Sequence, residues 1–95
     1  MIVRVSGLGQ FELDDTGTQK LDELDTRLTD ALNSGREEEF HQALAQTIRF
    51  IQENGKPVPA SVVVPSDVIV PPEDVTLDEA KGFFTDEGLM EPLPA

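Results

Sequence analysis

The 95-residue sequence contains no cysteine, tryptophan or tyrosine, and it has one histidine and five phenylalanines. Without cysteine, the chain cannot form a disulfide framework, a thiolate nucleophile or a thiolate metal site. With so few aromatic residues, its core must be mostly aliphatic. No apolar stretch approaches the roughly 20 residues that a membrane-spanning helix requires. The strand-like run Met1 to Val5, which contains Arg4, is also too short for the apolar region of a signal peptide.

Positive charge is scarce as well. Seven Lys and Arg residues against nineteen Asp and Glu residues give a formal net charge of −12 at pH 7. A field of this sign repels phosphate backbones and anionic lipid headgroups, so we expect neither direct nucleic-acid binding nor direct membrane insertion. The chain is 38% hydrophobic and 27% charged, which is typical of a compact soluble domain. Its length suits a single domain over residues 1–95.

Side-chain alternation predicts a β-hairpin over residues 1–13, with its loop at Gly7 to Gly9. The predicted register places three pairs opposite each other: Val5 with Phe11, Val3 with Leu13, and Arg4 with Glu12. One face of the hairpin is then apolar and the other carries a charge pair. Since a two-stranded ribbon is marginally stable alone, we expect its apolar face to pack against helices.

Helical spacing of apolar residues predicts an antiparallel helical hairpin over residues 18–54. The apolar face of the first helix comprises Leu21, Leu24, Leu28, Ala31 and Leu32. The charged residues that lie mostly off this face are Asp22, Glu23, Asp25, Arg27 and Asp30. The wider apolar face of the second helix comprises Phe40, Ala43, Leu44, Ile48 and Ile51. Thr16 or Thr18 would cap the first helix, Gly35 would break the pair, and Ser34 with Glu37 has capping-box spacing for the second.

The segment 56–74 changes character, because prolines interrupt two valine-rich triplets at residues 62–64 and 68–70. This composition predicts an extended segment. One triplet is a candidate third strand, which the prolines would restrict to a sheet edge.

A second capping-box spacing, Thr76 with Glu79, predicts a short helix over residues 76–88. Residues 89–95 form a tail. The predicted fold class is therefore α+β. It comprises an N-terminal β-hairpin, a helical hairpin, an extended valine and proline segment, and a short C-terminal helix.

Motifs that carry chemistry are weak. Gly7 and Gly9 lack the third glycine of a phosphate-binding GxGxxG loop, because Glu12 occupies that position. His41 is the only histidine, and a metal site would need further ligands around it. No GxSxG or SxxK arrangement is present for a serine nucleophile. We therefore predict that the protein is not an enzyme and that it has no cofactor and no metal site. We interpret His41 as a helix-flanking residue.

The order of these pieces resembles the PspA-associated protein family, PspAA. The likeness covers nearly the whole chain and lies in four stretches: MIVRVSGLGQFELDD, LDELDTRLTDALNSG, EEEFHQALAQTIRFIQENGKPVP and VPSDVIVPPEDVTLDEAKGFFTDEGL. Its most specific part is the proline-bounded motif formed by Pro65, Ser66, Asp67, Pro71 and Pro72.

This resemblance implies a small, non-enzymatic accessory protein that occurs with homologues of phage shock protein A in the envelope-stress systems of bacteria and archaea. Phage shock protein A is a long coiled-coil protein, related to the membrane-remodelling ESCRT-III proteins, that works at the cytoplasmic membrane surface. The implied partner is a PspA-like coiled-coil protein. The implied location is the cytoplasm, with recruitment to the inner face of the cell membrane through that partner.

Binding to such a partner would combine charge with apolar anchors. Acidic faces would attract rows of Lys and Arg on a long helix, with a steering effect that weakens as salt rises. The candidate anchors are Phe83, Phe84, Leu89 and Met90. The alternative for all four residues is that they complete this domain's own core.

Two other functions remain open at the level of sequence. An acidic nucleic-acid mimic would place carboxylates in rows at phosphate-like spacing on one surface and regulate a basic DNA-binding protein. A small hydrolase or phosphotransfer protein would be centred on His41.

Overall fold

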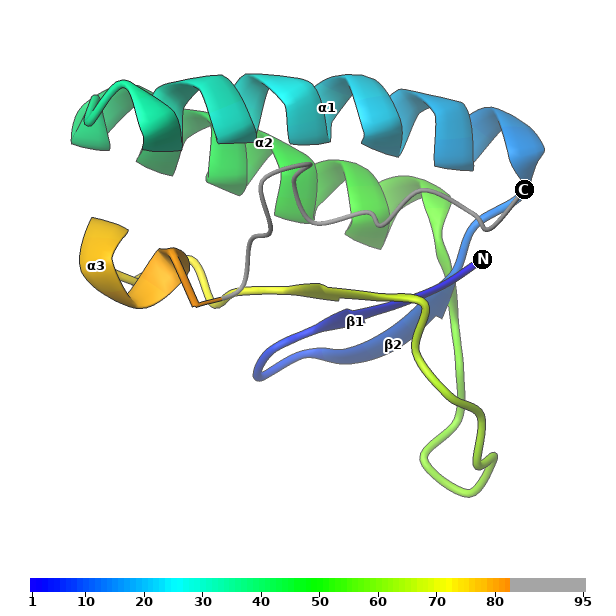
Figure 1. The fold of residues 1–95 in the computed structure, drawn as a ribbon. Coiled ribbons are helices and arrows are strands. Elements are labelled where there is room, and N and C mark those ends of the chain that lie inside the picture. Colours follow the sequence, from blue (N-terminus) through cyan, green and yellow to red (C-terminus); the bar gives the residue numbers. More distant parts are fainter. Residues whose placement is uncertain (83–95) are drawn as a thin grey trace, which may run out of the picture.

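In this computed structural model, which describes residues 1–82, the chain forms a four-stranded sheet with a helical hairpin over one face (Figure 1). The elements, in chain order, are β1 (Ile2–Val5), β2 (Gly9–Glu12), α1 (Asp15–Asn33), α2 (Glu37–Asn54), β3 (Lys56–Pro57), β4 (Val68–Val70) and α3 (Leu77–Ala80). The predicted α+β fold is confirmed, with its pieces in the predicted order. The predicted short helix over residues 76–88 is too long, because α3 ends at Ala80 and residues 81–82 form a turn. Its part beyond residue 82 and the predicted tail 89–95 lie outside the described residues.

The strand order in the sheet is β3-β2-β1-β4. β1 runs antiparallel to β2 and parallel to β4, and β2 runs antiparallel to β3. Val68–Val70 is therefore the third strand that the sequence suggested, and it lies at a sheet edge, as the flanking prolines require. The other triplet, residues 62–64, lies in the loop between β3 and β4. The two-residue strand β3 was not predicted.

The register of the hairpin differs by two residues from the predicted one. The observed pairs are Ile2 with Glu12, Val3 with Phe11, Arg4 with Gln10, and Val5 with Gly9. The prediction was wrong because it placed Gly9 in the loop. The loop is residues 6–8, closed by a 2.9 Å hydrogen bond from the Leu8 N–H to the Val5 carbonyl. Gly7 and Gly9 have φ values of 86° and 105°, which favour glycine. Because the shift is even, each strand keeps its predicted faces.

Asp14, rather than Thr16 or Thr18, caps α1. The Asp14 carboxylate accepts a 2.7 Å hydrogen bond from the Gly17 N–H, and the Asp14 backbone is extended. Aspartate caps helices at least as well as threonine. The helix therefore begins at the first good cap that follows the hairpin, and both threonine predictions were wrong.

Ser34 ends α1 instead of capping α2. Its N–H donates to the Asp30 carbonyl at 3.0 Å, and its backbone is helical, with φ −87° and ψ −4°. An N-cap residue needs a non-helical backbone, so the predicted capping box with Glu37 is wrong. Arg36 precedes α2 and makes no side-chain cap bond. The predicted break at Gly35 is confirmed, with a φ of 69°.

The second predicted capping box is confirmed at the start of α3. The Thr76 hydroxyl accepts a 3.2 Å hydrogen bond from the Glu79 N–H, and the Glu79 carboxylate accepts a 3.4 Å bond from the Thr76 N–H. This helix buries Ala80 and packs Leu77 against the core.

One core cluster joins the helical hairpin to the sheet. All ten residues predicted for the two apolar helix faces are buried: Leu21, Leu24, Leu28, Ala31, Leu32, Phe40, Ala43, Leu44, Ile48 and Ile51. Asp25 is a correction, since it was predicted off the apolar face but is only 3% exposed. Its spacing explains this, because Leu21 precedes it by four residues and Leu28 follows it by three, which places all three on one helix face.

Candidate functional site

The sheet has one face covered by helices and one open face. Alternation along the strands separates them: Val68 and Val70 of β4 are buried, while Ile69 between them is 48% exposed. Arg4 of β1 is exposed on the same open face and pairs with Ile69 in the parallel register. Gln10 pairs with Arg4 on its other side. A row of three side chains, from Ile69 through Arg4 to Gln10, therefore crosses the open face.

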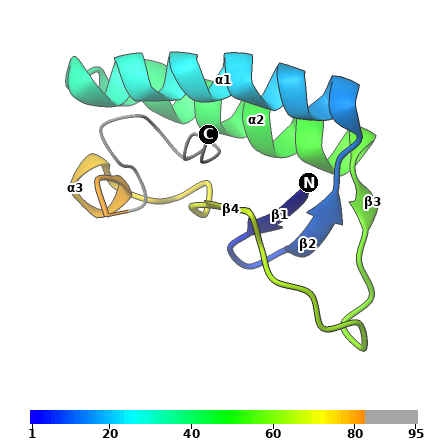
Figure 2. The same cartoon turned by 45° about the vertical axis from the view of Figure 1, so that its right-hand side comes forward.

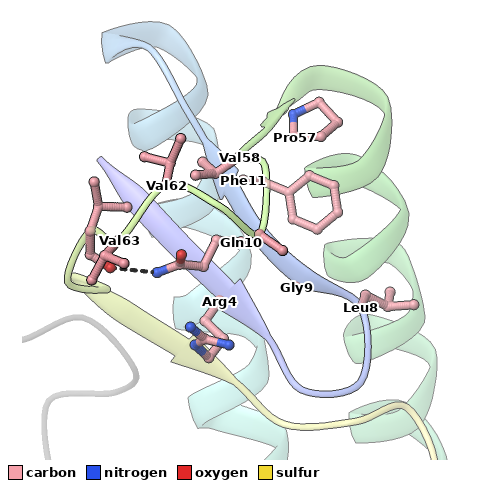
Figure 3. Close-up of a pocket in the computed structure, with 11 residues that line it drawn as sticks. Arg4, Leu8, Gly9, Gln10, Phe11, Pro57, Val58, Val62 and Val63 are labelled. Carbon is pink, nitrogen blue, oxygen red and sulfur yellow. Dashed lines mark hydrogen bonds between the residues drawn. The ribbon is translucent and has the colours of Figure 1, made fainter.

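The loop between β3 and β4 projects away from the helices and returns beside this open face (Figures 1 and 2). Gln10 holds it at both ends. The Gln10 side-chain amide donates to the Val64 carbonyl at 2.9 Å and to the Ser66 hydroxyl at 2.8 Å, and the Gln10 carbonyl accepts from the Val58 N–H at 2.9 Å. The loop is thereby fixed to β2 (Figure 3).

Asp67 joins the end of the same loop to β1. Its carboxylate accepts a 2.8 Å hydrogen bond from the Ile2 N–H, and its own N–H donates to the Ile2 carbonyl at 2.8 Å. Ser66 and Asp67 belong to the motif that is most specific in the sequence. Both residues therefore have a structural role, which is to place the loop and β4 against the hairpin.

A hollow of about 460 Å³ lies between the hairpin and this loop (Figure 3). Most of its lining is aliphatic, and among residues 1–82 Arg4 is the one charged residue that lines it. Around it stand apolar side chains that reach solvent: Leu8 is 50% exposed, Val62 45% and Val63 95%. We call Arg4, Leu8, Val62, Val63 and Ile69 the open-face patch.

The open-face patch was missed by the sequence analysis. The sequence did contain a signal for it, because residues 62–64 form an apolar triplet between two prolines and only one triplet was expected to become a strand. An apolar loop without a strand partner presents its side chains to solvent or to another molecule. The predicted anchors Phe83, Phe84, Leu89 and Met90 lie outside the described residues, so their role stays a prediction.

His41 makes a tertiary contact. Its Nε2 lies 2.6 Å from the Val75 carbonyl oxygen, and its ring lies 5.8 Å from that of Phe40. Because a carbonyl can only accept, Nε2 carries the proton and donates it. This bond ties α2 to the segment before α3. Within residues 1–82, no group of three or more His, Asp or Glu side chains is placed to hold a metal ion.

Exposed carboxylates occur on many elements of the described chain. They lie on β2, at the starts of α1, α2 and α3, along α1, and in the loops on both sides of β4. A nucleic-acid mimic would instead concentrate them on one surface. This distribution does not support the mimic hypothesis.

None of the helices within residues 1–82 is both long enough and apolar enough to cross a membrane.

The chain is thus a small α+β domain whose sheet has one helix-covered face and one open face. Its sequence matches the model of the family PspAA, PspA-Associated protein, over residues 1–92. The protein belongs to this family, as the resemblance indicated. No curated protein and no solved structure matches the chain.

Proposed function

We propose that the protein is a non-enzymatic accessory module of a phage-shock envelope-stress system, and that it acts by binding a PspA-like coiled-coil protein. The observation that carries the proposal is the family match over residues 1–92, since the family is named for its association with PspA. In this proposal the protein works in the cytoplasm, and its partner brings it to the inner face of the cell membrane.

The charge of the chain supports binding to a basic helical surface. A net charge of −12 repels anionic lipid and nucleic acid but attracts rows of Lys and Arg. Exposed carboxylates such as Glu37, Glu38 and Glu39 extend from the start of α2. Attraction of this kind raises the association rate and weakens as salt screens it.

Apolar anchors would supply the rest of the affinity. Phe83, Phe84, Leu89 and Met90 are proposed as anchors from the sequence alone. Replacing Phe83 and Phe84 together by serine would weaken binding if they are anchors. If they complete the domain core instead, the same change would lower thermal stability.

The test uses the full chain and the PspA-like protein of the same organism. Co-purification from cells at moderate salt should recover the PspA-like protein. Calorimetric titration of the purified pair should show saturable binding whose affinity falls as sodium chloride is raised. Failure of the purified pair to bind at low salt would contradict the proposed function.

A further inference from the structure

We propose that the open-face patch is the docking site for one amphipathic helix of the PspA-like partner, which seats aliphatic side chains in the hollow and a carboxylate on Arg4. This inference rests on the proposed function and deepens it by assigning a surface and the chemistry of the segment that binds there.

The apolar part of the patch is unusual for a protein surface. Val63 is 95% exposed although it lies in a loop tied to the sheet by hydrogen bonds, and Leu8 and Ile69 are about half exposed. Contiguous apolar side chains rimmed by polar residues mark interaction sites. Val63 lines the hollow and is itself 95% exposed, so the hollow is open to solvent and suits a protein surface whose side chains project into it.

The patch is held in place before any partner arrives. Gln10 anchors the loop at the Val64 carbonyl and at Ser66, and Asp67 anchors its end to Ile2. Ordering a loop on binding costs free energy, so a loop that is already fixed retains more of the contact energy as affinity.

The charge of Arg4 indicates which kind of side chain the bound segment carries. Arg4 is exposed, and within residues 1–82 it takes part in no ion pair. In the described part of the chain it is the one charged residue that lines the hollow, so a carboxylate in the partner's apolar stripe would complement it. A second copy of this chain is disfavoured as occupant, because each copy carries a net charge of −12.

The shape of the site favours a helix. An extended peptide would add to a sheet edge, whereas the patch lies on a sheet face and its adjoining loop. Helices cover sheet faces in layered folds, and α1 and α2 already cover the opposite face of this sheet. A coiled-coil partner consists of helices, so the occupant and the proposed function agree.

The test measures binding of the full chain to the full-length PspA-like protein by calorimetry, with two pairs of variants matched in charge. Arg4→Glu is compared with Arg49→Glu, an equal charge change at an exposed site on α2. Val63→Asp is compared with Gln52→Glu, also exposed on α2. We expect each patch variant to lose about tenfold or more in affinity. The two α2 variants should bind like the wild type. Unchanged circular dichroism melting of all four variants would show that the fold is intact.

The outcomes separate this inference from the proposed function. If the wild type binds and the patch variants bind as tightly as their α2 controls, the docking site is wrong while the proposed function stands. If sedimentation shows a wild-type dimer that Val63→Asp dissociates without weakening partner binding, the occupant is a second copy and the inference is overturned. If the wild type does not bind, both proposals fail. A carboxylate-to-lysine change in the partner helix that restores binding to Arg4→Glu, and does not help Arg49→Glu, would confirm the proposed pairing.

Discussion

The two faces of the sheet are made by the same strands but do different work. On β4, Val68 and Val70 are buried against the helical layer, while Ile69 between them stands half exposed beside Arg4. The covered face belongs to the core cluster and contributes stability. The open face contributes little to that core and is proposed to bind a partner. These three consecutive residues are similar in size and apolarity. Because side chains alternate along a strand, the outer two pack in the core and the middle one faces the proposed partner.

The first prediction tests the difference between the two faces by placing an aspartate on each of them in turn. Val68→Asp puts a charge into the core, and we expect it to lower the free energy of unfolding by about 3–5 kcal/mol, since the charge has no partner there. Ile69→Asp changes a half-exposed neighbour and should cost less than about 1 kcal/mol. Urea denaturation of both variants measures the difference. Equal losses would show that the open face is part of the core.

The second prediction concerns a variant that should loosen the loop between β3 and β4 and leaves the apolar side chains of the open-face patch unchanged. Gln10→Ala removes the side-chain bonds to the Val64 carbonyl and the Ser66 hydroxyl. We expect a loss of about 1–2 kcal/mol in stability. Amide exchange should become faster in residues 58–67. Unchanged exchange in that loop would mean that Gln10 does not hold it.

A smaller loss of stability is expected from a substitution on the helix-covered side of the sheet. His41→Ala removes the bond from Nε2 to the Val75 carbonyl. Its loss should cost about 1 kcal/mol and should increase amide exchange in residues 71–82 more than in the hairpin. Binding to the partner should not change, because His41 is not part of the open-face patch. Lost binding with an intact fold would place His41 in the interface instead.

The smallest expected change in stability is at the C-terminal end of α1, on neither face of the sheet, and it is compared with the N-cap of the same helix. Asp14→Ala should cost about 1 kcal/mol because Asp14 caps α1. Ser34→Ala should be close to neutral, since Ser34 contributes its backbone and no side-chain cap bond at the end of α1. Thermal melts of the two variants measure this contrast. A larger loss for Ser34→Ala would restore the capping role expected from the sequence.

The sequence predicted the apolar faces of the two long helices well. All ten apolar helix positions were correct because each helix repeats its pattern over several turns, so one misplaced residue cannot change the face. The exception, Asp25, lies at helical spacing from two buried leucines, and its charge argued against burial. The predicted N-caps of α1 and α2 were wrong because several polar residues near each helix start could act as the cap.

Features that depend on contacts between distant residues could not be predicted. The triplets at residues 62–64 and 68–70 have nearly the same composition, yet one is a loop and the other a strand. The difference lies in the anchors. Asp67 bonds to both backbone groups of Ile2 and aligns the second triplet with β1, whereas Gln10 holds the first through the Val64 carbonyl. The open-face patch follows from these anchors, so it became visible only in the fold.

The most direct measurement is the calorimetric titration of the full-length PspA-like protein with the wild type and with Ile69→Asp, after both chains have been shown to melt at similar temperatures. The account predicts that the wild type binds and that Ile69→Asp, altered only on the open face, loses about tenfold or more in affinity. Equal affinity of the two chains would contradict the assignment of binding to the open face.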